Sequence, residues 1–121
     1  MAYGHTRIAV PEAAETLRAA ALRWEGVTVL PHRFGGIEFR LGRRELGHLH
    51  GSELLDIPFP MQVRNELVAA GDVLPHHTLP SSGWISFHIA TAADVEKALL
   101  LLRRSYEIAS RSAAQKAASA S

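Results

Sequence analysis

The chain contains no cysteine. Without thiols it can form no disulfide, thiolate nucleophile, iron–sulfur cluster or zinc–thiolate site. A bound metal ion would therefore need histidine, aspartate or glutamate ligands.

Long apolar runs and a strong charge excess are also missing. No window approaches the roughly 20 apolar residues that span a bilayer, and the N-terminal stretch has no apolar core of a secretory signal. We therefore expect a cytoplasmic protein with no membrane partner. Thirteen basic residues stand against twelve acidic ones, for a net charge of +1, so a nucleic-acid partner is not expected from the overall charge.

The residues that are present suit one globular domain. The chain has 121 residues, of which 47% are hydrophobic and 21% charged. That length supports one hydrophobic core but not two. We predict a single domain over residues 1–110 and, because the apolar periodicity is lost after Ser110, a disordered tail over residues 111–121.

Apolar residues recur at helical spacing in some segments and alternate with polar residues in others. Thr91 and Asp94 have the spacing of a capping box at the start of a long helix. The pattern predicts an α+β fold, with a mainly antiparallel sheet of four to five strands and helices packed on one face. The predicted order is helix 11–25, strands 27–30, 37–41, 44–50 and 53–59, helix 61–70, a loop over 74–83, strand 84–89, and a helix from residue 91.

Two histidines stand two residues apart on a predicted strand. Because side chains alternate along a strand, His48 and His50 leave the same face and can act on one bound molecule. Strict alternation predicts that Leu46 shares this face and that Glu45 lies on the other.

More histidines are predicted to lie nearby. His76 and His77 are in the proline-bounded loop, and we expect only one of them to point inward. Trp84 can form a flat wall for a planar ligand, and His88 shares its strand face. The predicted substrate-binding residues are Trp84, His76, His88 and Arg44, the last because the hairpin arginines can contact an anion.

Several interpretations of the histidines remain open. Strand histidines often bind only a backbone carbonyl. As a cluster, His48, His50 and His77 can instead hold a divalent metal ion. Without metal, one of them can act as a general base. Asp56 and Glu53 can orient an imidazole or face solvent.

The segment Gly36–His50, with a later histidine, Trp84 and the closing sequence ADVEKALLLLRRSYEIA, resembles the luciferase-domain family named for fungal luciferases. The resemblance extends from about Phe34 to Ile108. Its most specific part is Arg44–His50 together with His77 and Trp84, and short bacterial proteins of this family look similar along nearly their whole length.

The resemblance implies a small oxygenase-type enzyme that acts on a planar enolic or phenolic compound such as a hydroxypyrone. In the fungal enzymes O₂ is the co-substrate, no cofactor is required, CO₂ is lost from a peroxide and light is emitted. On that pattern His48 or His50 is the catalytic base, His77 polarises a carbonyl or stabilises the peroxide, and Trp84 stacks on the ligand. The N-terminal membrane-associated portion of the fungal enzymes has no counterpart in this sequence, so we expect a shared pocket with another substrate rather than light emission.

A non-catalytic alternative also remains open. The chain would then be a small-molecule or histidine-ligated metal-binding module, or a weak nucleic-acid-binding domain that uses the arginine hairpin. Self-association as a homo-oligomer is compatible with either interpretation.

Overall fold

A six-stranded antiparallel sheet and three helices make up the fold in the computed structural model, which describes residues 11–32 and 35–120. None of the helices in these two ranges has the length and apolarity that a bilayer crossing requires. The elements are α1 (Ala13–Ala21), β1 (Val27–Pro31), β2 (Ile37–Leu41), β3 (Arg44–His50), β4 (Leu54–Pro58), α2 (Met61–Ala69), β5 (Leu74–Pro75), β6 (Trp84–His88) and α3 (Ala92–Ala120).

The strands are ordered β1-β2-β3-β4-β6-β5 across the sheet. The first four follow chain order, and β6 then pairs with β4 before the short β5 closes the edge. The register places His48 opposite Asp56, and Asp56 opposite Ser86. Three neighbouring strands therefore present polar side chains in one row.

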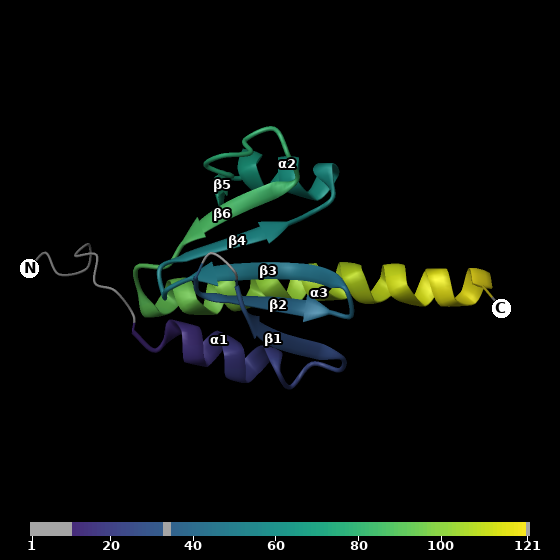
Figure 1. The fold of residues 1–121 in the computed structure, drawn as a ribbon. Helices are drawn as coiled ribbons and strands as arrows, with labels where there is room; N and C mark the ends of the chain where they lie inside the picture. Colours follow the sequence, from purple (N-terminus) through teal and green to yellow (C-terminus); the bar gives the residue numbers. More distant parts are fainter. Residues whose placement is uncertain (1–10, 33–34, 121) are drawn as a thin grey trace, which may run out of the picture.

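The helices cover one face of the sheet. Figure 1 shows α3 running behind the strands, with α1 beside it and the C-terminal part of α3 extending beyond the sheet. The ion pair between Arg104 of α3 and Glu66 of α2 places α2 on the same side. Fully buried apolar residues from both layers form the core, which includes Leu17, Phe39, Leu49, Leu55, Ile57, Ile85 and Leu102. No helix of the described residues covers the opposite face of the sheet.

Strand β3 contains one extra residue relative to β2. Phe39 pairs with Gly47 whereas the next residue, Arg40, pairs with Glu45, so Leu46 forms a β-bulge. The bulge turns Leu46 into the core, where it is fully buried. Its carbonyl oxygen accepts a 2.8 Å hydrogen bond from the Ser105 hydroxyl on α3, which satisfies a backbone group that the bulge takes out of the strand ladder.

The bulge corrects the predicted side-chain directions on this strand. Strict alternation placed Leu46 with the histidines and Glu45 on the other face. Because the extra residue shifts the alternation by one, Glu45 lies on the histidine face and bonds to His48.

The α+β class, the antiparallel sheet and helices on one face are confirmed. The sheet has six strands rather than four or five, because β5 forms inside the segment predicted as a loop. In the tail predicted to be disordered, residues 111–120 continue α3. Alanine-rich sequence favours helix without any apolar stripe to pack, so periodicity could not reveal it.

The predicted capping box is confirmed at the start of α3. The Asp94 amide donates to the Thr91 hydroxyl at 3.2 Å, and the Thr91 amide donates to the Asp94 carboxylate at 3.1 Å. We expect Thr91→Ala to lower the free energy of unfolding by about 1 kcal/mol, because one amide at the helix start loses its partner. Urea unfolding measures this loss. Ser119→Ala is the control, because Ser119 is exposed near the other end of α3, and it should have no comparable effect.

Candidate functional site

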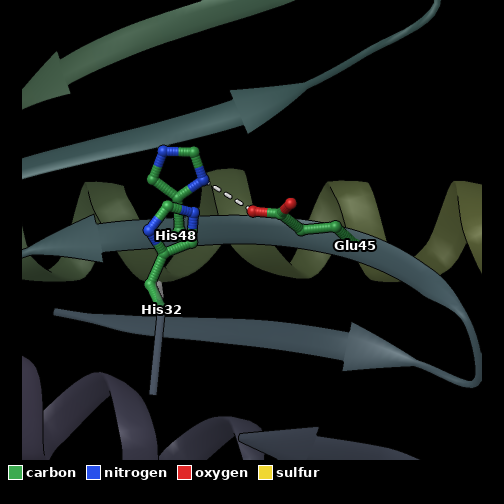
Figure 2. A group of neighbouring side chains, drawn as sticks. All are labelled: His32, Glu45 and His48. Carbon is green, nitrogen blue, oxygen red and sulfur yellow. Dashed lines mark hydrogen bonds and ion pairs between the residues drawn. The ribbon is translucent and has the colours of Figure 1, made fainter. Parts of the chain in front are cut away.

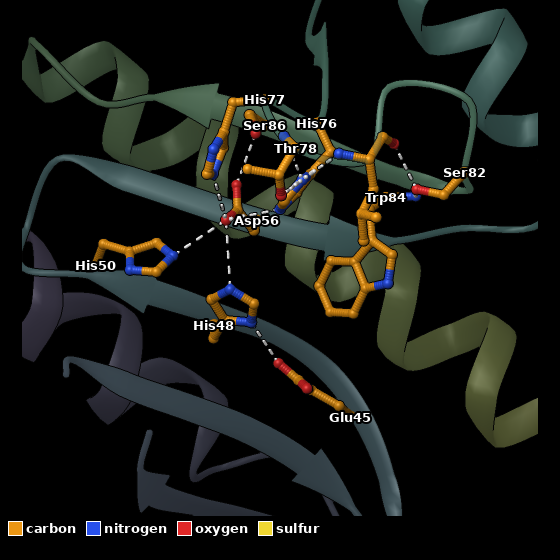
Figure 3. A network of polar contacts seen from close by, with 11 residues as sticks. Glu45, His48, His50, Asp56, His76, His77, Thr78, Ser82, Trp84 and Ser86 are labelled. Atoms are coloured by element: carbon orange, nitrogen blue, oxygen red, sulfur yellow. Dashed lines mark hydrogen bonds and ion pairs between the residues drawn. The ribbon is translucent and has the colours of Figure 1, made fainter. Parts of the chain in front are cut away.

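Asp56 is the centre of the polar cluster on the helix-free face of the sheet. It is fully buried in the middle of β4. Four imidazoles direct their Nε2 atoms at its Oδ2 oxygen, at 3.1 Å for His50, 3.3 Å for His48, 3.3 Å for His76 and 3.7 Å for His77. Figure 3 shows these rings converging from β3 and from the segment after β5. The three histidines predicted as catalytic are therefore brought together.

The second oxygen of Asp56 is already engaged. Ser86 on β6 donates its hydroxyl to Oδ1 at 2.7 Å. A carboxylate oxygen offers only about two acceptor positions, so Oδ2 cannot accept a hydrogen bond from all four imidazoles. The cluster therefore contains more ring nitrogens than one oxygen can satisfy.

His48 lies between two carboxylates. Its Nδ1 is 2.6 Å from Glu45 Oε2, and its Nε2 faces Asp56. An ionised carboxylate only accepts, so Nδ1 carries the hydrogen and donates it to Glu45. Burial by itself would lower the pKa of His48, but the hydrogen bonds with Asp56 and Glu45 outweigh it and raise this pKa to about 9.

His76 is fixed in the opposite tautomer. Its Nδ1 accepts hydrogen bonds from the backbone amides of Thr78 and Leu79, each at 3.2 Å. Nδ1 therefore carries no hydrogen, and in the neutral ring the proton is on Nε2, which donates it to Asp56. Burial lowers the pKa of His76, and the neighbouring His77 acts in the same direction while Asp56 opposes both.

The pKa of Asp56 reflects the same network. Burial alone would raise it, because a charge in the interior is poorly solvated. The hydrogen bonds from His48 and Ser86, together with the nearby His76 and His48 rings, outweigh burial and hold the pKa of Asp56 well below its usual range. The carboxylate is therefore ionised and acts as a buried negative charge.

Exposure distinguishes the imidazoles. The His48 side chain is 13% exposed and His76 is buried, whereas His50 is 34% and His77 is 56% exposed. The two loop histidines differ in burial, but both direct Nε2 at Asp56, rather than one alone as expected from the sequence. Trp84 lies beside the cluster, with its ring centroid 5.2 Å from His48 and 6.1 Å from His76.

His32 extends the cluster toward β1. Its ring stacks on His48, with centroids 4.3 Å apart and planes 25° apart, and Figure 2 shows the two rings over β3 beside Glu45. A pocket of about 640 Å³ begins at this point and is lined by Leu30, Arg40 and Glu38 as well as by His32 and Glu45. Its volume is in the range of small-molecule sites.

Three groups of side chains have ligand atoms close enough to share a metal ion, within 4.8 Å of one another. In the described part of the chain these are His48, His50 and Asp56; Asp56, His76 and His77; and His32, Glu45 and His48. The ligand set predicted from the sequence, His48, His50 and His77, is thus spread over two groups joined by Asp56.

Two predicted substrate-binding residues are not brought to the cluster. Arg44 is exposed and lines a hollow with Ala109, Ser112 and Lys116 of α3, on the side of the helices. His88 shares the strand face of Trp84 but is exposed at the end of β6, and its ring contacts none of the four imidazoles around Asp56.

Several residues of the cluster were not singled out from the sequence. The sequence predicts Asp56 only as one of two acids that orient an imidazole or face solvent, and strict alternation places Glu45 on the other face of the strand. Neither Ser86 nor His32 was predicted as a site residue. For Asp56 and Ser86 the signal is the strand register, which places Asp56 opposite both His48 and Ser86 and follows only from knowing which strands pair.

Comparison with known proteins supports the resemblance seen in the sequence. The family model for the luciferase domain matches residues 43–105, which is more than half of the chain. Searches of curated proteins and of solved structures found no match. The matched segment contains β3, β4, β6 and all four imidazoles around Asp56. The chain belongs to the luciferase-domain family.

Proposed function

We propose that this protein is an oxygenase-type enzyme that binds a planar enolic or phenolic compound beside Trp84 and activates it for reaction with O₂. The observation that carries the proposal is the convergence of four imidazoles on one buried, ionised carboxylate next to an aromatic ring and a pocket. Such a cluster supplies both a proton acceptor and a positive field for an enolate oxygen.

His77 is the proton acceptor in this proposal, with His50 next to it at the substrate. These two have the most exposed imidazoles in the cluster, whereas His48 is held at both ring nitrogens by carboxylates. The substrate O–H bond breaks and its proton moves to His77. The electron pair left on the oxygen delocalises into the ring as an enolate, and a ring carbon then forms a bond to O₂ to give a peroxide.

The reacting substrate would stack against Trp84. The half-buried indole presents a flat apolar surface next to the polar cluster. A planar, conjugated compound buries one face on such a ring at little entropic cost. The pocket bordered by His32 and Glu45 leaves room for substituents of the ring.

O₂ uptake with a 3-hydroxy-2-pyrone as the probe tests the proposal. We expect uptake by the wild type and none by the double variant His48→Ala/His50→Ala, because His50 is then missing at the substrate and Asp56 has lost two of its four imidazoles. His77→Ala should lower the turnover number by about 10²–10⁴-fold, the usual contribution of a general base. Each variant is checked for its fold by circular dichroism.

His88→Ala is the matched control, because it removes an exposed histidine on the same strand face without touching the cluster. It should retain the wild-type rate. Wild-type uptake by the folded double variant would show that neither His48 nor His50 is needed for the reaction. No uptake by the wild type with either a hydroxypyrone or a simple catechol would contradict the proposed reaction itself.

A further inference from the structure

We infer that His48, His50 and Asp56 form a binding site for one divalent transition-metal ion. The inference concerns the cluster used in the proposed function but does not need its substrate, so the two can fail separately. It starts from the shortage of acceptors at Asp56 Oδ2, where four ring nitrogens meet one oxygen. A cation accepts lone pairs from nitrogen and oxygen together and so resolves this shortage.

Ring orientation separates the three candidate groups. The lone pair of an imidazole nitrogen lies in the plane of its ring, so two ligating rings must point toward a common position. The rings of His32 and His48 are stacked at 25°, and those of His76 and His77 at 22°. Stacked rings lie in nearly parallel planes, so one ion cannot lie in the ring plane of both. His48 and His50 are nearly perpendicular, at 87°, with both Nε2 atoms turned toward Asp56.

The distances also suit a shared ion. The two Nε2 atoms lie 3.3 and 3.1 Å from Asp56 Oδ2. Ligands that are each about 2.0–2.1 Å from a metal ion are separated from one another by roughly 3 Å. Two histidines and one carboxylate that leave positions open are the donor set of many oxygen-activating iron(II) sites. The metal class is thus a first-row divalent ion.

The surrounding hydrogen bonds hold the ligands in place. Glu45 keeps the Nδ1 hydrogen of His48, so the nitrogen that turns toward the proposed ion, and that gives up its hydrogen when the ion binds, is Nε2. A carboxylate in this position commonly orients a metal-binding histidine. Ser86 and His76 hold Asp56 in place, through Oδ1 and Oδ2 respectively.

His76 itself is excluded as a ligand through Nε2. Its Nδ1 accepts two backbone amides, so the hydrogen of the neutral ring is on Nε2. A nitrogen that carries a hydrogen has no lone pair in the ring plane to donate. His77 has an exposed side chain 3.7 Å from Oδ2 and remains available to the substrate.

Metal titration of the tag-free full chain tests the inference. The protein is treated with EDTA, dialysed, and titrated with Co²⁺, followed by its visible absorption, and with Zn²⁺ in competition. We expect one ion per chain in the wild type. His50→Ala and Asp56→Asn should each weaken binding by at least about 100-fold, and Glu45→Gln by about 10-fold, the effect typical of a residue that orients a ligand.

Variants of two histidines outside the proposed ligand set are the controls. His32→Ala and His88→Ala should both bind one ion as the wild type does. Loss of binding in His32→Ala with retention in His50→Ala would overturn the assignment, as would the absence of stoichiometric binding by the wild type. Because His50 is partly exposed, its variant keeps the test decisive should the buried Asp56 variant fail to fold.

Turnover separates this inference from the proposed function. Stoichiometric binding without O₂ uptake would contradict the proposed function alone. O₂ uptake by EDTA-treated protein that binds no ion would contradict the metal site alone.

Discussion

Asp56→Asn should lower O₂ uptake by about 10²–10⁴-fold while leaving the fold in place. The two side chains have nearly the same shape, so the substitution opens no cavity in β4. The amide has no negative charge, however, and offers one acceptor oxygen where the carboxylate offers two. Its NH₂ group would meet either the Ser86 hydroxyl or the imidazole Nε2 atoms that now converge on the site.

The measurement is steady-state O₂ uptake with the hydroxypyrone, together with circular dichroism and urea unfolding. Asp72→Asn is the matched control, because Asp72 is a partly exposed aspartate whose carboxylate pairs with Lys97. It should have the wild-type rate. Ser86→Ala should have a smaller effect than Asp56→Asn, since it removes one hydrogen bond but leaves the charge. Wild-type turnover in a folded Asp56→Asn protein would show that the carboxylate does not organise the cluster.

Local patterns predicted most of the fold. The strands predicted over 37–41 and 44–50 are present and pair with each other, the strand predicted over 53–59 is present as β4, and the capping box at Thr91 forms both of its hydrogen bonds. These features depend on residues close in sequence, so spacing and residue type suffice to find them. Strand β5 has only two residues, which is too short for alternation to be recognised.

The site was predicted in part. Alternation along β3 placed His48 and His50 together correctly, because no bulge separates them. It failed for Glu45, because the bulge at Leu46 depends on how β2 pairs with β3. The central position of Asp56 depends on contacts from β3, from β6 and from the segment after β5 at once. Such a convergence belongs to the tertiary structure and has no local signal.

Gly83→Ala should lower the free energy of unfolding by more than about 3 kcal/mol, because the added methyl group would collide with the backbone. A Cβ atom at this position would lie 2.1 Å from the carbonyl oxygen of Phe59. The two residues are held together there, since the Phe59 amide donates to the Gly83 carbonyl at 3.0 Å. No side-chain rotation can relieve such a contact, so β4 and β6 would have to separate where Trp84 begins its strand.

Urea unfolding followed by tryptophan fluorescence measures this loss, with Gly51→Ala as the control. Gly51 has open space around its Cβ position and a positive φ of 59°, so alanine there should cost only about 1–2 kcal/mol of backbone strain. Equal losses in the two variants would mean that the close approach of β4 and β6 is not what Gly83 provides. If the Gly83 variant folds, the displaced Trp84 should lose its contact with His48, and O₂ uptake should fall even at low temperature, where the chain remains native.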